Sequence, residues 1–350
     1  MPPTVVRANC VTSSSSPAPI STSQKHVAIG LRAMLAMALF AAAGFVSAET
    51  VKLILAHGNP PANPRHIAAL KFVETVKAKT EGRIGIQVIH SAQFGDDEAM
   101  ITALRSGALD FSANSQGAVS AVVPEFAALG MPFLFADARK AWEVMDGPIG
   151  KDLAKKTAAA GMVLLGLWDN GIRQMSNSKR PIKSPADMKG LRMRTPPDPI
   201  TVDIMHAMGA EAQPIKFSAL YAALEQGLVD GQENSLINIV SAKLYEVQKY
   251  VSISGHKYES TPFLMSQQTW DRMTPADQLA ITEAAAEATQ LQRRLNKEIE
   301  DKLMSDLKGK GLEVDAVDRK AFADASSAVY KKWITSPIGD FVKRVVQAAR

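Results

Sequence analysis

The segment from Val51 to His90 most constrains the fold, because it reads as a strand, a helix and a second strand in immediate succession. Residues 51–56 are a short apolar run of strand length. Residues 65–80 repeat apolar side chains at the helical period, and residues 84–90 alternate apolar and polar side chains. A helix that crosses between two neighbouring strands makes those strands parallel. We therefore expect an α/β protein with parallel strands.

Strands and helices continue to alternate further along the chain. Residues 98–105 and 138–161 have helical periodicity, and residues 162–167 are an uninterrupted apolar strand, typical of a sheet covered on both faces. We also expect Ser218 to cap a helix over residues 219–226, and residues 230–234 to form a turn. The other strands are expected over residues 109–113, 191–194, 250–254 and 263–266.

Residues 275–308 contain no proline or glycine after Pro275. Thr274 is a residue type that caps helices, and proline is favoured at the first position of a helix. We therefore predict one helix over the whole segment, which is much longer than the average helix of a globular protein. Further helices are expected over residues 321–345.

Residues 1–48 read as a leader that contains a signal peptide. Basic residues precede an apolar run over residues 33–46, and Ser47 and Ala48 are small residues that suit cleavage before Glu49. A membrane anchor is the alternative, but an apolar run of about 14 residues is shorter than the roughly 20 that a spanning helix needs. We therefore expect export to the periplasm, with cleavage between Ala48 and Glu49.

Composition excludes several function classes. The chain has 350 residues, enough for two domains, of which 46% are apolar and 21% charged. Residues 1–48 hold three of the 40 basic residues and no acidic one, so 37 basic residues face 35 acidic ones after cleavage. Because the basic residues are dispersed, we expect no nucleic-acid partner. The single cysteine, Cys10, lies in the leader, so the exported chain has no cysteine for a disulfide or a nucleophile.

Three stretches carry the chemistry that points to a ligand. They are WDNGIR (residues 168–173), KGLRMRTPP (189–197) and VDGQEN (229–234). The guanidinium of Arg194 offers a planar fork of donors that matches a carboxylate, although an isolated arginine is more often a surface charge or an ion-pair partner. The amide of Asn234 can donate to a carboxylate oxygen while its carbonyl is held by the turn. The three stretches predict a site that binds a small anion.

The order and spacing of three motifs resemble the solute-binding proteins of TRAP transporters, in the DctP-like group. KGLRMR, FSALYAAL (residues 217–224) and DGQEN match the family pattern, and the resemblance extends from about Val51 to the C-terminus. It implies a two-lobed periplasmic binding protein fold with a ligand cleft between the lobes and a long spine helix. Lobe I would comprise residues 49–170 and 259–298, and lobe II residues 171–258 and 299–350.

The same resemblance implies the function and several site residues. The chain would capture a small carboxylate, of the sugar-acid or C4-dicarboxylate type, and deliver it to TRAP membrane permease subunits, with no ATP, metal or other cofactor and as a monomer. Arg194 aligns with the family's carboxylate clamp, whereas Arg192 reads as structural or solvent-facing. The other ligand-facing positions would be Arg173, Asn234, Phe217, His57, Trp168, Asp169, Asn114 and Ser115.

Four of these positions have a plainer interpretation. Arg173 could pair with Asp169 near the hinge, and His57 could be an ordinary loop histidine. Phe217 suits a core as well as a cleft wall. Asp169 could accept hydroxyl hydrogen bonds from a polyol ligand, which would favour a sugar acid, or it could only cap the turn that follows.

The sequence contains none of the common enzyme motifs. H-E-x-x-H, G-x-S-x-G, C-x-x-C and the phosphate-binding loop are absent, and the six histidines show no metal-type spacing. A periplasmic enzyme acting on a carboxylate through a scattered site is one alternative, and a sensory module that presents its ligand to a receptor kinase is another. The sequence leaves the identity of the carboxylate open.

Overall fold

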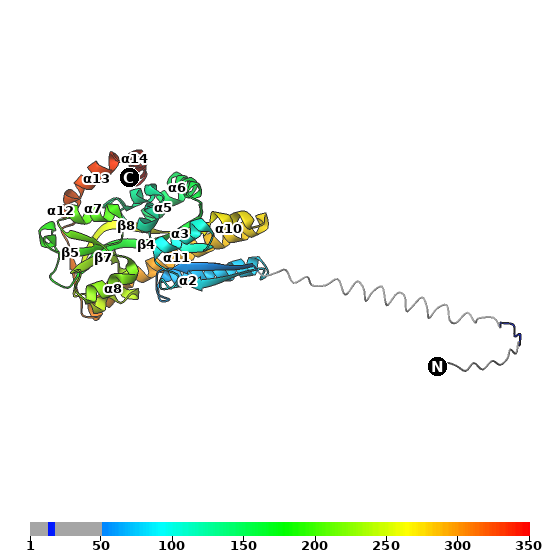
Figure 1. Cartoon of the computed structure of the whole chain (residues 1–350). Coiled ribbons are helices and arrows are strands. Elements are labelled where there is room, and N and C mark those ends of the chain that lie inside the picture. Colours follow the sequence, from blue (N-terminus) through cyan, green and yellow to red (C-terminus); the bar gives the residue numbers. More distant parts are fainter. Residues whose placement is uncertain (1–12, 18–50) are drawn as a thin grey trace, which may run out of the picture. The chain divides into compact units, whose positions relative to one another are not determined.

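The computed structural model describes residues 13–17 and 51–350 (Figure 1). The predicted signal peptide and its cleavage site lie outside these described residues. In the described part of the chain, no helix combines the length and the apolar character that a membrane crossing requires.

The predicted strand–helix–strand unit is confirmed. β1 (Val51–His57) lies parallel to β2 (Ile84–Ile89) and to β3 (Phe111–Ala113), with α2 (Pro64–Lys79) and α3 (Asp97–Ser106) as the crossovers. The side chain of Asn63 accepts a hydrogen bond from the backbone of Arg65 at the start of α2, and Asp96 caps α3 in the same way. These caps fix the two helix starts that lie beside the carboxyl ends of the strands.

Among the described residues, nine strands form one sheet in the order β2-β1-β3-β8-β4-β7-β5-β6, with β9 (Glu313–Ala316) paired to β8. β4 (Met162–Asn177) and β8 (Tyr250–Ser266) are long antiparallel partners at its centre (Figure 1). The expected strand end near Trp168 is therefore wrong, and so is the division of β8 into two strands. The pairing of β4 with β8 shifts register at three places. The strands continue there through polar and glycine residues, which in the sequence resemble a loop.

The second parallel unit contains β5 (Arg192–Thr195), α7 (Pro199–Ala207), β6 (Glu211–Pro214), α8 (Phe217–Glu225) and β7 (Gly231–Ser235). The turn predicted over residues 230–234 is wrong, because β7 is a fully buried strand between β4 and β5. Its polar side chains resemble a turn sequence, but they have buried partners. Ser218 is likewise not a cap, since α8 already begins at Phe217.

The remaining helices cover the sheet. The helix predicted over residues 138–161 is two helices, α5 and α6, because Pro148 has no N–H to continue the first one. The other elements are α4 (Gln116–Ser120), η1 (Pro124–Gly130), α5 (Ala138–Asp146), α6 (Pro148–Ala159), η2 (Pro185–Met188), α9 (Leu236–Ser241), η3 (Leu244–Glu246), α10 (Gln267–Arg272), α12 (Arg319–Ala325), α13 (Ser327–Ile334) and α14 (Gly339–Ala348).

The long helix is confirmed as α11 (Pro275–Gly309), which has 35 residues and contacts α2, β4, α9 and β9. Its polar side chains hold the backbone of β4: Gln292 and Asn296 donate to the carbonyl of Asp169, at 2.7 Å each. α11 therefore contacts elements from both predicted lobes. The exact lobe boundaries stay a prediction, since the sheet runs through both without a break.

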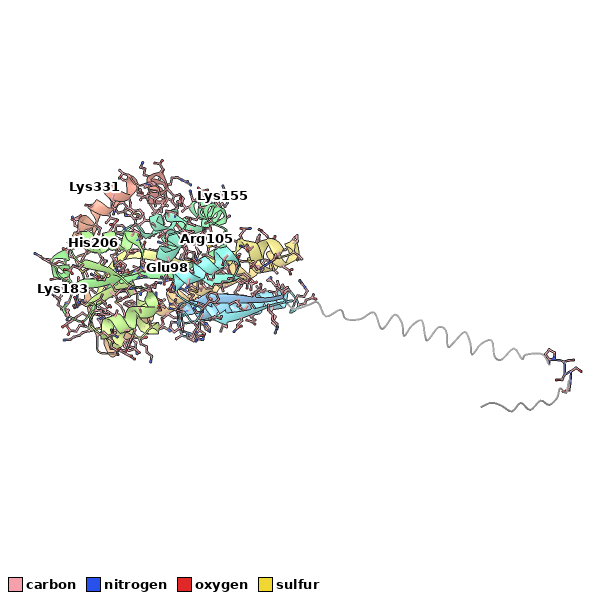
Figure 2. All side chains as sticks on the ribbon, in the orientation of Figure 1. Glu98, Arg105, Lys155, Lys183, His206 and Lys331 are labelled. Carbon is pink, nitrogen blue, oxygen red and sulfur yellow. The ribbon has the colours of Figure 1, made fainter. Side chains whose placement is uncertain are left out.

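Charged side chains are spread over the outside of the fold. Figure 2 labels Lys155, Lys183 and Lys331, which are exposed and come from α6, from the loop before η2 and from α13. The positive charge of these lysines is thus divided among separate elements.

Candidate functional site

A pocket lies where the loop after β1, the start of α3, β4, the end of β5 and the starts of α8 and α9 meet. Its lining is rich in charged and amide side chains: Asn59, Arg65, Asp96, Asp97, Glu98, Asn170, Arg173, Arg194, Lys216, Asn234, Asn238 and Glu259. Ser115, Phe217 and Ser218 also line it. Chain segments from across the sequence therefore supply one polar cavity.

Arg194 is a buried cation without an anionic partner. It is the third residue of β5 and is 2% exposed. Its Nε donates to the carbonyl of Ile215 at 2.7 Å, whereas its two terminal nitrogens have no hydrogen-bond partner among the described residues. Burial lowers the pKa of Arg194 to about 10, with Glu233 acting in the opposite direction, so the guanidinium stays charged at neutral pH. A buried, unpaired charge of this kind is unfavourable unless a ligand supplies the counter-ion.

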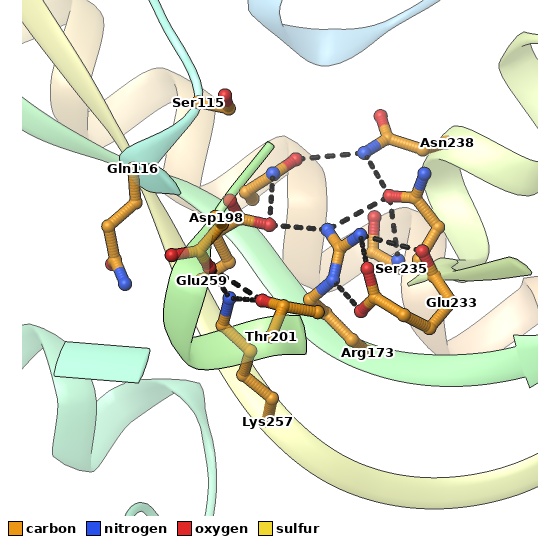
Figure 3. A network of polar contacts seen from close by, with 12 residues as sticks. Ser115, Gln116, Arg173, Asp198, Thr201, Glu233, Ser235, Asn238, Lys257 and Glu259 are labelled. Atoms are coloured by element: carbon orange, nitrogen blue, oxygen red, sulfur yellow. Dashed lines mark hydrogen bonds and ion pairs between the residues drawn. The ribbon is translucent and has the colours of Figure 1, made fainter. Parts of the chain in front are cut away.

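Arg173, on β4, has its donors occupied by protein groups (Figure 3). Its Nε and Nη2 bind the carboxylate of Glu233, and its Nη1 binds Glu259. Burial acts to lower the pKa of Arg173, but the two carboxylates outweigh it and raise the pKa. The predicted alternative of an ion pair with Asp169 is therefore wrong, because Glu233 and Glu259 are the partners.

Glu233 is the buried anion of this network. Burial acts to raise its pKa, but Arg173 and a contact of 3.4 Å with Nε2 of His256 hold the pKa well below its usual range. The carboxylate therefore stays ionised at neutral pH and fixes the position of Arg173 in the pocket wall.

A chain of asparagines continues from Arg173. Oδ1 of Asn234 accepts from Nη1 of Arg173 at 3.0 Å and from Nδ2 of Asn238 at 2.8 Å. Nδ2 of Asn234 has no partner in the part of the chain that the structure describes, so this donor is free for an acceptor in the pocket. Asn238 in turn accepts from Asn59 and donates to Asn170 at 2.9 Å each, which joins α9 to the loop after β1.

Arg65 brings a third guanidinium to the cavity. It lies at the start of α2, is 5% exposed, and its Nη2 donates to Oγ1 of Thr261 at 2.6 Å. Burial lowers the pKa of Arg65, opposed by the charges of Asp97 and Glu259. Within the described residues no carboxylate lies within ion-pair distance of Arg65, so its contacts are with neutral acceptors.

Two carboxylates of the lining, Asp97 and Glu259, are held by neighbouring donors. Asp97 accepts from Nδ2 of Asn114 at 3.0 Å and from Oγ of Ser115 at 2.7 Å, which fixes its orientation. Glu259 is 1% exposed; its Oε2 binds Arg173 and Asn170, and its Oε1 has no partner in the described residues. Both carboxylates retain lone pairs for further donors.

An ion-pair cluster lies beside the outer part of the pocket. Nζ of Lys216, just before α8, is 2.6 Å from Asp96 and 3.3 Å from Glu98, at the start of α3. Phe217 and Ser218 follow Lys216 in the lining. The cluster connects two walls that come from distant parts of the sequence.

The structure brings five of the nine predicted residues to the pocket. Arg173, Arg194, Asn234, Phe217 and Ser115 line it. Their contact with a ligand stays a prediction.

The other four are not among the residues that line the pocket, and their contact with a ligand also stays a prediction. Trp168 is buried against Phe263, at 4.5 Å between ring centroids, and donates to Thr289 of α11. Asp169 accepts from Asn296 of α11, and Asn114 is buried behind Asp97. His57 binds His66 at 3.1 Å, and burial lowers its pKa to about 3, so it is a neutral interior histidine.

Sequence reasoning missed Arg65, Asp97, Asn170, Asn238 and Glu259. Glu259 belongs to the run HKYES (residues 256–260), which interrupts two apolar strands. Charged residues flanked on both sides by strand sequence are a signal that could have indicated a continuous strand with buried charges. Arg65 stands out only as an arginine at the first turn of a helix, where basic residues are unfavourable.

The arrangement is rich in groups that can bind an organic anion. Within the described residues there is no group of histidine, cysteine and carboxylate side chains that could hold a metal ion. The pocket instead combines guanidinium and amide donors with fixed carboxylates, a set that suits an organic acid with further polar groups.

Residues 55–336 match the family described as bacterial extracellular solute-binding protein, family 7 (DctP). The uncharacterized protein y4mM of Sinorhizobium fredii is 52% identical over 79% of this chain, and this chain spans about half, 51%, of that protein. The 2,3-diketo-L-gulonate-binding periplasmic protein YiaO of Escherichia coli is 34% identical over 75% of this chain and 80% of the relative.

Solved structures have the same fold. A TRAP periplasmic solute binding protein from a Polaromonas species, bound to D-erythronate, has a TM-score of 0.82 and 34% identity, over 85% of this chain and 98% of its own. The sugar acid binding protein DctPAm of Advenella mimigardefordensis, in complex with galactonate, has a TM-score of 0.84 and 29% identity, over 86% and 98% of the two chains. The two-lobed α/β fold expected from the sequence is the fold of these structures.

Proposed function

Because the chain belongs to the DctP family of bacterial extracellular solute-binding proteins, we propose that it captures a small organic anion in the periplasm and delivers it to TRAP permease subunits. The ligand is a carboxylate of the sugar-acid or C4-dicarboxylate type. The protein binds this ligand reversibly and leaves it chemically unchanged. Residues 1–48 direct export and are removed before Glu49.

The observation that carries this proposal is the unpaired guanidinium of Arg194 in the pocket wall. Its Nε is held by the carbonyl of Ile215 at 2.7 Å, which leaves the two terminal nitrogens to donate to one carboxylate. The free Nδ2 of Asn234 supplies a further donor. A carboxylate bound there restores the missing counter-charge in a site from which water is largely excluded.

Binding is coupled to closure of the two lobes about β4 and β8. The ligand contacts residues of both lobes and so stabilises the closed state relative to the open one. The closed state contains hydrogen bonds between the lobes. One example is the hydrogen bond of 2.9 Å from Asn59, in the loop after β1, to Asn238 of α9. The permease then recognises the closed, loaded protein.

A thermal-shift screen of the purified protein tests the proposal. The panel contains aldonates, uronates, dicarboxylates and keto acids, and recovery of the unchanged compound after incubation separates binding from catalysis. A ligand at 100 times its dissociation constant should add about 2.7 kcal/mol to the free energy of unfolding. Absence of a shift for every carboxylate, or multiple turnovers of one, would refute the proposed function.

A further inference from the structure

The pocket presents two chemically different groups of side chains, and we propose that together they select a hydroxylated monocarboxylate over a dicarboxylate, with Arg65 as a specificity-determining residue. This inference rests on the proposed function and narrows its ligand class. The first group, the Arg194 group, consists of Arg194 and Asn234. The second, the Arg65 group, consists of Arg65, Asp97 and Glu259.

The two groups lie at different positions along the sheet. Arg65 contacts Thr261 of β8 and reaches the carbonyl of Ala113 in β3 at 3.5 Å. Arg194 lies on β5, which is separated from β8 by β4 and β7 in the strand order. A ligand that contacts both groups therefore extends along the pocket and presents a different part of itself to each.

The Arg194 group offers donors only. The terminal nitrogens of Arg194 and Nδ2 of Asn234 lack partners among the described residues, and no acceptor of this group is free: Oδ1 of Asn234 already accepts from Arg173, Asn238 and the backbone N–H of Ser235. An ionised carboxylate is an acceptor-only group. The Arg194 group therefore suits the carboxylate of the ligand.

The Arg65 group offers both donors and acceptors. Arg65 contributes a guanidinium whose contacts are with neutral oxygens, at 2.6 Å for Thr261 and 3.4 Å for Asn170. Asp97 contributes a carboxylate that Ser115 and Asn114 hold in place. A hydroxyl both accepts and donates, so it can bind Arg65 and Asp97 at once, which a second carboxylate cannot.

The charges of the cavity also favour a single carboxylate. Arg173 is matched by Glu233 and Glu259, and Lys216 by Asp96 and Glu98. Arg65 and Arg194 contact only neutral oxygens, and the carboxylates of Asp97 and Glu259 act on both cations without direct contact. A second carboxylate beside the Arg65 group would meet Asp97 and the buried, partly unpaired carboxylate of Glu259. The charged lining residues are four cations (Arg65, Arg173, Arg194 and Lys216) and four carboxylates (Asp96, Asp97, Glu98 and Glu259), so the lining holds no excess of positive charge for a second carboxylate.

Isothermal titration with matched ligands tests the inference in the unaltered protein. The four-carbon set is D-erythronate, succinate and tartrate, and the six-carbon set is galactonate, adipate and galactarate. Within at least one set, the hydroxylated monocarboxylate should bind about tenfold or more tightly than either diacid. The comparison of erythronate with tartrate, and of galactonate with galactarate, isolates the second carboxylate from the hydroxyls.

Two pocket variants assign the effect to the Arg65 group. Arg65→Gln should weaken the hydroxylated monocarboxylate by about tenfold or more, because its hydroxyls lose a charged donor. Asp97→Asn should reduce the preference for monocarboxylate over diacid by about tenfold, because the like-charge repulsion is removed. Arg192→Gln removes a guanidinium outside the pocket and should leave the preference unchanged, and melting without ligand verifies that each variant is folded.

Three outcomes would overturn the inference: equal or tighter binding of the diacids in both sets, no binding of either hydroxylated monocarboxylate, or an unchanged preference in a folded Asp97→Asn variant. The proposed function fails separately. It is refuted if no carboxylate of the wider screen binds, or if one of them is turned over.

Discussion

Arg173 and Arg194 are buried guanidiniums of the same pocket that differ in what they contact. Arg173 is enclosed by two carboxylates and an amide oxygen, whereas Arg194 has one backbone carbonyl. In the protein without ligand, Arg173 has carboxylates in direct contact and Arg194 has none. The first arginine therefore serves mainly to build the pocket wall, and the second is available to a ligand.

Replacing each arginine by methionine, which keeps much of the volume and removes the charge, should have opposite effects on stability. Arg173→Met leaves the buried carboxylates of Glu233 and Glu259 without this cationic partner, so it should lower the free energy of unfolding by about 3–5 kcal/mol. Arg194→Met removes a buried charge that has no partner, so the variant should be as stable as the wild type or more stable. Urea unfolding without ligand measures both, and an equal loss in the two variants would contradict this assignment of roles.

The sequence permitted part of this site to be predicted residue by residue. Arg194 and Asn234 lie in motifs that carry the resemblance and Arg173 lies in the stretch WDNGIR, and all three line the pocket. The partners of Arg173 could not be predicted, because Glu233 and Glu259 lie 60 and 86 residues away in the sequence. Strand register decides which carboxylate lies beside which guanidinium. Residue patterns do not predict this register.

Among the secondary-structure elements, sequence periodicity predicted the bounds well where the buried face of an element is apolar along its whole length. The apolar strand β1 and the helix α11, without an internal proline or glycine before its end, were predicted within a residue at each end. β4 and β8 were not, because polar side chains along them are buried in hydrogen bonds rather than in an apolar core. Buried polar strands look like loops when hydrophobicity is the only guide.

The continuity of α11 gives a prediction at this scale. Ala285 is fully buried within the helix, so Ala285→Pro removes a hydrogen bond and introduces a clash in the segment that packs against α2 and β4. The free energy of unfolding should fall by about 3 kcal/mol or more. Ala285→Gly is the matched control and should lose only about 1 kcal/mol of helix propensity, apart from the lost methyl contacts. Equal melting temperatures for the proline variant and the wild type would show that the packing of this helix is not continuous.

At the scale of the whole molecule, the pocket depends on contacts between segments that the sequence keeps far apart. The Lys216–Asp96 ion pair, 2.6 Å long, joins the start of α8 to the start of α3, and the Asn63–Asn238 hydrogen bond of 3.0 Å joins the start of α2 to α9. Family resemblance predicted a cleft between two lobes. The contacts that cross this cleft could not be predicted from the sequence. Their residues are polar and lie at loops and helix starts, where such residues are usually exposed.

We expect the two free nitrogens of Arg194 to hold the carboxylate of the ligand. Calorimetric titration of Arg194→Lys and Arg194→Ala, with the ligand found in the screen, tests this contact. Lysine keeps the charge without the fork, so affinity should fall about tenfold or more, and alanine leaves the carboxylate buried without a partner, so it should fall several-hundred-fold, roughly 3–5 kcal/mol.

Arg192→Ala, two residues earlier on the same strand, is the matched control, because Arg192 pairs with Asp230 outside the pocket. Its affinity for the ligand should equal that of the wild type. If Arg194→Ala instead binds within about threefold of the wild type while Arg192→Ala is also unchanged, the carboxylate is held elsewhere and the account given for Arg194 is wrong.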